Sequence, residues 1–444
     1  MAINIKHKLK QFINEGFFHI FGSSVIAKLG GIVSSIVVVR GLPKAEYGHY
    51  VDAENLYAYI AIFIGFGISN SIIQYCSENV SDAKRNAIYR FSLKIGFWGN
   101  FILCPLILIF SVIKHFSGSL DESLYLPLFL LLPFFTFIDY YHQYVLRAKL
   151  NNKEFGRTNM VYTVSHVCGN IIFAKLFGVV GLIVSQYLAH LISATYSFFV
   201  LRKNTFYKQV FSGTEKLDKP FIKEFLSYSL ISALTTFAST ALTLLDVTCL
   251  GILLDNAEML ADYKVALTIP TALLFVPKSF MTYYYPKLVK AFSNGRKEGL
   301  KEVKIYFAVN IVLNLVISAG IIIFSPLMIQ ILYGEKYMNV VPVFRILGLN
   351  FFFAALRFIS AHVISVLKKV KFNLVFTIVS GIVNVGINFA LIPLWGNTGA
   401  AIATALTSIL MLVINICYLV LYFSRYKESP DFFKNRIDPK KSCP

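Results

Sequence analysis

Long apolar segments recur from one end of this chain to the other, separated by short polar stretches. A helix needs roughly 20 consecutive apolar residues to cross the hydrocarbon core of a bilayer. The pattern predicts twelve such spans and hence an all-α polytopic membrane protein. The predicted ranges are 17–39, 54–75, 95–113, 124–146, 158–176, 179–201, 226–251, 259–285, 305–325, 341–367, 372–394 and 399–423.

The stretch from Asn388 to Leu406 joins two of these spans with almost no polar connection. Pro393 is expected to end one helix, and Gly396 and Gly399 permit a tight turn. No Lys, Arg, Asp or Glu lies between Phe372 and Ser424, whereas basic residues return on both flanks. The stretch therefore predicts a hairpin that crosses the membrane twice from its positively charged side.

Composition agrees with a membrane protein, because 56% of the residues are hydrophobic and 15% are charged. A soluble domain carries roughly 25% charged residues. The N-terminus, the loops after even-numbered spans and the C-terminus carry 32 Lys and Arg, against 6 in the intervening loops. By the positive-inside rule, both termini are expected in the cytoplasm. The net charge of +19 is then explained by loops that face anionic membrane lipid, and no nucleic-acid partner is expected.

Weak internal similarity divides the chain into two halves. The turns F-G-V-V-G at 177–181 and W-G-N-T-G at 395–399 lie 218 residues apart, and the same offset relates Asn170 to Asn388. The similarity predicts two lobes of six helices related by a pseudo-two-fold axis. The predicted parts are an N-terminal lobe at 1–201, a basic cytoplasmic linker at 202–225, a C-terminal lobe at 226–424 and a basic cytoplasmic tail at 425–444.

Several basic side chains lie inside the predicted spans, where a charge costs at least ~2.5–3.5 kcal/mol unless it meets water or a partner. Lys264 and Lys278 lie fourteen residues apart in the predicted span 259–285, nearly four helical turns, so they are expected to share one face. Such bases could line a cationic cavity suited to phosphate. The structural alternative is that the lysines snorkel or that each base pairs with an acid. The candidate substrate-binding residues are Lys28, Lys264, Lys278, Arg345 and Arg357.

Two acids, Asp246 and Asp139, are the candidate ion-coupling residues. Asp246 is the most central acid and could hold a proton or another coupling ion, or it could form a structural pair. Asp139 precedes Tyr140, Tyr141 and His142 near the expected cytoplasmic end of its span, so an interfacial role is as plausible.

No catalytic pattern stands out in the sequence. The histidines share no metal-ligand spacing, and no nucleophile triad, paired-carboxylate site or ATPase phosphate loop is present. Neither a metal nor a cofactor is expected, apart from coupling to a proton or sodium gradient. The protein is therefore expected not to be an enzyme.

Four segments resemble polysaccharide flippases of the Wzx type, which belong to the MOP exporter superfamily. The pattern N-x-x-L-I-P-x-x-G-x-x-G-A-A-I-A-T at 388–404 is similar to a signature near the end of that family. Further similarities lie at 39–50, from Asp246 to Tyr263, and at 332–348. The resemblance covers the whole chain and implies a MATE-like fold of twelve helices in two lobes, with alternating access.

The resemblance also implies a function in O-antigen, lipopolysaccharide or capsule biosynthesis. The family moves an undecaprenyl-pyrophosphate-linked oligosaccharide from the cytoplasmic to the outer leaflet of the inner membrane. The expected partners are that glycan lipid, anionic membrane lipid and a polysaccharide polymerase. Three alternatives stay open: a cation-coupled multidrug antiporter, a flippase of lipid-linked peptidoglycan precursor, and a membrane-embedded glycosyltransferase or polymerase. The excess of intramembrane bases over acids favours an anionic lipid substrate, and the short outer loops disfavour an enzyme.

Overall fold

The computed structural model describes residues 17–76, 81–254, 256–367 and 369–425. Within these ranges the chain forms helices and turns and no β-strand, which confirms the predicted all-α fold. The first sixteen residues and the predicted basic tail beyond Arg425 lie outside the described residues.

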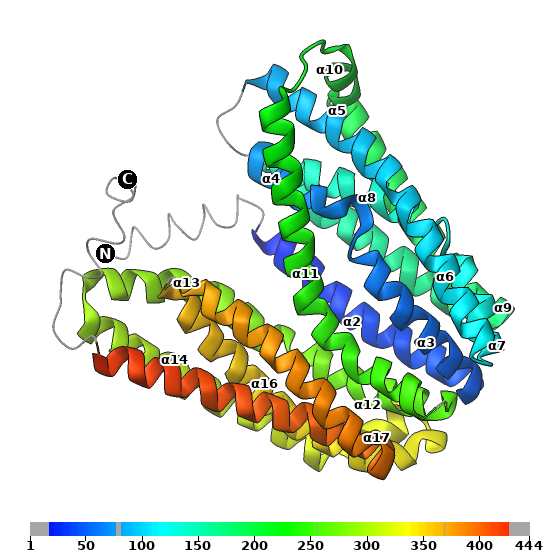
Figure 1. Ribbon diagram of the computed structural model, residues 1–444, viewed down its shortest axis with the longest axis vertical. Coiled ribbons are helices and arrows are strands. Elements are labelled where there is room, and N and C mark those ends of the chain that lie inside the picture. The colour runs from blue at the N-terminus through cyan, green and yellow to red at the C-terminus, as the bar shows by residue number, and fades with distance from the viewer. Residues whose placement is uncertain (1–16, 77–80, 255, 368, 426–444) are drawn as a thin grey trace. The chain divides into compact units, whose positions relative to one another are not determined.

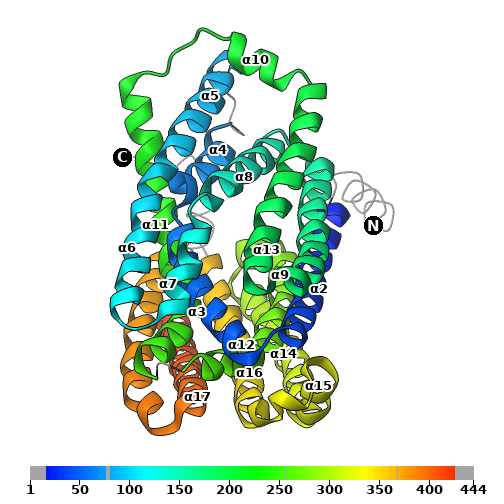
Figure 2. The same cartoon turned by 90° about the vertical axis from the view of Figure 1, so that its right-hand side faces the viewer.

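The chain forms two compact units that divide between Ala241 and Leu242, within helix α11 (Lys219–Leu253). The predicted linker 202–225 contains the short helix α10 and the start of α11. In the first unit, α2 and α8 both pack against α9, and Figure 2 shows α2 beside α9. The helices before α11 are α2 (Phe17–Gly41), α3 (Lys44–Ala61), η1 (Ile64–Gly67), α4 (Ile68–Cys76), α5 (Asp82–Gly99), η2 (Asn100–Ile102), α6 (Leu103–Phe116), α7 (Leu120–Tyr125), η3 (Leu126–Phe129), α8 (Leu132–Ala148), α9 (Asn152–Lys203) and α10 (Phe206–Ser212).

In the second unit, α16 packs against both α14 and α17 (Figure 1). Buried aromatic and aliphatic side chains from α13, α14, α16 and α17 form its core, with Tyr284 stacked on Tyr306 at 4.9 Å between ring centroids. The helices after α11 are α12 (Ala257–Leu273), α13 (Phe275–Asn294), α14 (Arg296–Ile323), α15 (Ser325–Tyr333), η4 (Glu335–Val340), α16 (Val341–Val366) and α17 (Val370–Arg425).

Six helices are individually long and apolar enough to cross a membrane, and two bent helix pairs raise this number to eight among the described residues. One pair corresponds to the predicted span 54–75, which bends by 41° between α3 and α4. Two of the long helices, α9 and α17, are 52 and 56 residues long. A straight helix of that length would measure about 80 Å, more than twice the ~30 Å hydrocarbon core. The protein is thus a multi-pass membrane protein, and each long helix must contain two spans.

The two long helices, α9 and α17, each fold back at one glycine. Gly178 has φ 57° and ψ −137°, and Gly396 has φ 53° and ψ −131°, a region that favours glycine. The fold-back in α9 brings Ser185 close enough to donate a hydrogen bond to Asn170, fifteen residues earlier. In a straight helix these residues would lie about 22 Å apart. The predicted turns at 177–181 and 395–399 are therefore confirmed, and their backbones match closely.

A second glycine completes each turn by allowing close backbone approach. A Cβ atom on Gly399 would lie 2.3 Å from the carbonyl oxygen of Leu391, and one on Gly181 would lie 1.9 Å from that of Phe173. Both distances are far below any van der Waals contact. An alanine at either position would force the two arms of its hairpin apart.

We therefore expect Gly399→Ala to lower the melting temperature of the purified protein, at a cost of about 1–3 kcal/mol for overpacking. Gly386→Ala is the matched control in the same helix, because its Cβ atom would meet nothing within 4 Å. Thermal unfolding of both variants in detergent measures the difference. Equal melting temperatures for Gly399→Ala and Gly386→Ala would contradict the proposed close approach.

Candidate substrate and ion sites

Two of the predicted bases, Lys278 and Arg357, meet on the ring of Phe358 in the second unit. The Nζ atom of Lys278 and the Cζ atom of Arg357 each lie 4.9 Å from the ring centroid. An aromatic face attracts cations through its quadrupole, so Phe358 can hold two like charges near one another. The arrangement places concentrated positive charge on α13 and α16.

The Arg357 side chain also lines a small pocket of about 90 Å³, with mixed polar and apolar walls, between α16 and the two arms of α17. Its Nε atom is buried and has no hydrogen-bond partner among the described residues. Such an unsatisfied buried donor is costly, and a charged acceptor would satisfy it. The pocket therefore suits an oxyanion. Its other lining residues are Phe358, Ala361, Asn373, Phe376, Thr377, Met411 and Asn415.

The other predicted bases lie away from this pair. Arg345 is exposed near the start of α16 and donates from Nε to Ser325 Oγ at 2.8 Å, about 18 Å from Arg357 along the helix. Lys264 is half-buried in α12 and lies in the same span, Ala257–Met281, as Lys278, about 21 Å from it along the helix axis. Lys28 is exposed in α2 of the first unit.

The acid Asp246 lies buried in α11, where neutral donors from three other helical segments converge on it. Its Oδ1 atom accepts from Asn388 Nδ2 at 2.9 Å, and its Oδ2 atom accepts from Tyr263 at 2.9 Å and from Thr404. Asn388 also donates to Asn384 Oδ1 at 3.0 Å. None of these donors carries a charge, so they orient the carboxylate without neutralising it.

One acceptor in this cluster has no donor. The Oδ1 atom of Asn388 is buried and lacks a hydrogen-bond partner among the described residues. A negative carboxylate, an unused amide oxygen and the Thr404 hydroxyl are ligands of the kind that hard cations prefer. The cluster around Asp246 can therefore take a small cation or a proton, and it does not resemble a transition-metal site.

The corresponding position of the first unit is neutral. Asn170, which the 218-residue offset relates to Asn388, donates to Ser34 Oγ at 2.7 Å. Ser34 lies in α2, the first helix of the first half. Asp246 likewise lies in α11, the first helix of the second half. Each asparagine thus links one arm of its hairpin to the first helix of its half. The bonded group is a carboxylate in the second unit alone.

The second candidate acid, Asp139, is fully buried in α8, packed against α9. It accepts from Ser193 Oγ at 2.7 Å and from Gln143 Nε2 at 3.0 Å, and its Oδ2 atom lies 3.0 Å from His190 Nδ1. The ring of Tyr162 packs on His190 at 4.7 Å between centroids. These contacts place Asp139 in the interior of its unit, within a hydrogen-bonded pair with a histidine.

The sequence matches a known protein family and an uncharacterized membrane protein. A family model described as polysaccharide biosynthesis protein matches residues 13–292, which is more than half of the chain. The chain belongs to the polysaccharide biosynthesis protein family. This family member is also 21% identical over 426 residues to the uncharacterized membrane protein MJ1068 of Methanocaldococcus jannaschii, covering 90% of this chain and 82% of the relative.

Solved structures show which fold the family member has. An inward-facing multidrug resistance MATE family transporter of the MOP superfamily matches with a TM-score of 0.69 at 13% identity, over 90% of this chain and 95% of the transporter. The lipid II flippase MurJ in an inward closed conformation matches with a TM-score of 0.66 at 13% identity, over 94% of each chain. The predicted MOP-type fold of about twelve helices is thereby confirmed.

Several residues of these sites were not indicated by the sequence of this family member. Tyr263, Thr404 and His190 join their clusters through contacts between distant segments, and Phe358 is one of many aromatic residues. Tyr263, Asn388 and Thr404 lie in segments that carry the family resemblance, and the 218-residue offset also singled out Asn388. Neither signal indicated that these side chains contact the same buried carboxylate.

The Asp139 cluster gives a stability prediction. Asp139→Ala removes the acceptor of Ser193 and Gln143, and we expect it to destabilise the protein by at least about 1–3 kcal/mol because buried donors are left unsatisfied. Asp139→Asn, which retains one oxygen, should cost less. Asp82→Ala is the control, since that side chain is 90% exposed. Equal melting temperatures for the two alanine variants would count against the cluster.

Proposed function

We propose that this protein is a flippase that moves an undecaprenyl-pyrophosphate-linked oligosaccharide, such as an O-antigen or capsule repeat unit. Translocation runs from the cytoplasmic to the outer leaflet of the inner membrane by alternating access, with both termini in the cytoplasm. Membership in the polysaccharide biosynthesis family supports the glycan, and the fold of MOP transporters supports movement across the membrane. The observation that carries the proposal is the cationic pair on Phe358 beside the Arg357 pocket.

The pair has the chemistry that a pyrophosphate headgroup needs. A guanidinium can form two parallel hydrogen bonds to a phosphate group, and a nearby ammonium adds a mobile point charge. Arg357 lies well inside α16, where a base is expensive unless an anion or another polar group compensates it. The Thr377 hydroxyl and the amide oxygens of Asn373 and Asn415 around the pocket can accept hydrogen bonds from sugar hydroxyls, while both amide nitrogens donate within the unit. Lys264, Lys28 and Arg345 remain candidates for other stages of the passage.

The carboxylate cluster supplies a site for a coupling ion. We assign this role to Asp246, because its neutral donors leave one negative charge for a sodium ion or a proton to balance. Asp139 is the second candidate, with His190 as its partner. Beyond the glycan lipid, the proposed partners are anionic lipids at the basic loops and the polymerase that would use the transported unit.

A second candidate function is cation-coupled export of drugs. The buried Asp246 favours it, since a carboxylate could bind either a proton or a cationic drug. The pair formed by Lys278 and Arg357 argues against it, because two bases near one another repel a cationic substrate.

Loss of the cationic pair should abolish most transport. We expect Arg357→Ala combined with Lys278→Ala to reduce surface polysaccharide roughly tenfold or more at matched expression, because each lost charged hydrogen bond costs about 1.5–3 kcal/mol. Arg357→Lys should restore part of the activity. Lys301→Ala, which removes an exposed base on α14 that belongs to none of the candidate sites, is the control. Full surface polymer in the double variant would refute the assignment.

Binding of the coupling ion should stabilise the wild-type protein. Replacing choline by sodium, or lowering the pH from about 8 to 6 if the ion is a proton, should raise the melting temperature, since a ligand at about 100 times its Kd contributes roughly 2.7 kcal/mol. Asp246→Asn should remove this response. Asp262→Asn is the control, a buried carboxylate of the same unit that accepts from Asn339 instead. A response that persists in Asp246→Asn would exclude the site.

A further inference from the structure

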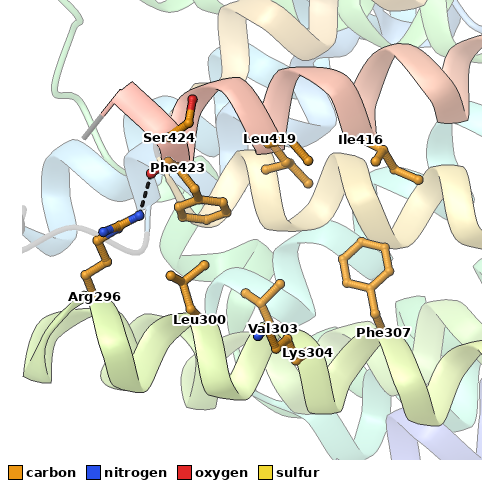
Figure 3. A pocket seen from close by; sticks show the side chains of 10 residues that line it. Arg296, Leu300, Val303, Lys304, Phe307, Ile416, Leu419, Phe423 and Ser424 are labelled. Atoms are coloured by element: carbon orange, nitrogen blue, oxygen red, sulfur yellow. Dashed lines mark hydrogen bonds between the residues drawn. The ribbon is translucent and has the colours of Figure 1, made fainter. Parts of the chain in front are cut away.

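A crevice of about 460 Å³ runs between α14 and the last turns of α17 in the second unit (Figure 3). It is separate from the Arg357 pocket and shares no lining residue with it. None of the residues that line it is acidic. They are Arg296, Leu300, Val303, Lys304, Phe307, Ile416, Leu419, Val420, Phe423 and Ser424.

The wall of the crevice is almost wholly apolar, and its polar residues lie at the margin. Arg296 and Ser424 lie at one end, whereas Phe307 and Ile416 lie at the other (Figure 3). Lys304 is exposed, and its long side chain can carry the ammonium group towards the polar end. A crevice that is cationic at one end and apolar at the other matches an amphiphile with an anionic head.

The crevice extends from the polar first turns of α14 to the start of its apolar span. Arg296 is the first residue of α14, and the eleven residues to Phe307 span about 16 Å of helix. The predicted apolar span begins at residue 305, directly after Lys304. Lys304 therefore lies at the depth of lipid headgroups, and Phe307 lies at the edge of the hydrocarbon core.

Packing beneath the crevice shows how its polar end is built. The side chains of Val303 and Leu419 on its floor belong to the buried core of the unit. Phe423 stacks on Phe292 at 6.0 Å, and Phe292 occupies the space that a Cβ atom on Gly299 would need. The guanidinium of Arg296 donates to the carbonyl oxygen of Phe423. This hydrogen bond fixes the cation beside the opening, between the two helices.

We propose that the crevice binds an anionic glycerophospholipid of the leaflet that meets the start of α14. One acyl chain occupies the apolar part, and the headgroup phosphate contacts Arg296 and Lys304. Charge complementarity selects this occupant, because the lining contains two bases and no acid. The site is a lipid-binding site distinct from the proposed substrate site, so it does not depend on which substrate the protein moves.

The test measures lipid retention by the purified full-length protein in native mass spectrometry. Phosphatidylglycerol and phosphatidylcholine with identical acyl chains are added at equal concentration. Wild type should retain the anionic lipid preferentially, and Arg296→Ala with Lys304→Ala should reduce that preference roughly tenfold or more, because each lost cation weakens attraction to anionic lipid. Lys297→Ala with Lys301→Ala is the matched control, since both side chains are exposed on α14 outside the crevice.

Two further variants keep the test decisive if loss of Arg296 disturbs folding. Lys304→Ala alone should weaken the anionic preference, and Leu300→Trp should block the apolar part and reduce retention of both lipids. Undecaprenyl phosphate is added as a competitor. Equal losses in the lining and control pairs, wild-type retention by Leu300→Trp, or stronger binding of undecaprenyl phosphate than of phosphatidylglycerol would each overturn the proposal.

Discussion

The buried carboxylate of Asp246 constrains how the second unit can fold. A charge in a membrane span must be compensated, neutralised or heavily hydrogen-bonded. Three neutral side chains donate hydrogen bonds to this carboxylate: Tyr263 from α12, and Asn388 and Thr404 from the two arms of α17. Asn388 and Thr404 can reach the same carboxylate only because α17 folds back at Gly396. The hairpin and the proposed ion site are therefore one arrangement, and a change to either should disturb the other.

The two halves share this architecture but differ in its chemistry. Each has a glycine-broken hairpin with nearly identical backbone angles, and in each an asparagine bonds the first helix of its half. In the first unit that partner is the hydroxyl of Ser34, and in the second it is the carboxylate of Asp246. A duplicated scaffold thus carries an uncompensated charge in one copy, and the cationic pair of Lys278 and Arg357 lies in the same copy. The coupling ion and the anionic headgroup would then both bind in the second unit.

The sequence predicted what depends on neighbouring residues, and it missed what depends on distant ones. Apolar length indicated the spans, and glycine spacing indicated the turns at Gly178 and Gly396, because both properties are local. The partner of Asp139 is His190, 51 residues away, and no local pattern could indicate that pairing. Lys278 and Arg357 meet on the ring of Phe358 across two helices, and no local pattern in either helix could indicate that contact. Where the candidate bases lie was therefore less predictable than the scaffold that carries them.

The most direct test of the central claim is translocation by the protein alone. Purified protein is reconstituted into liposomes that contain an undecaprenyl-pyrophosphate-linked oligosaccharide, and a membrane-impermeant lectin measures how much glycan is exposed on the outside over time. The account predicts that wild type accelerates exposure of the pyrophosphate-linked glycan and that the same glycan on an uncharged polyprenyl carrier crosses far more slowly. No acceleration over protein-free liposomes, or equal rates for the charged and uncharged carriers, would contradict it.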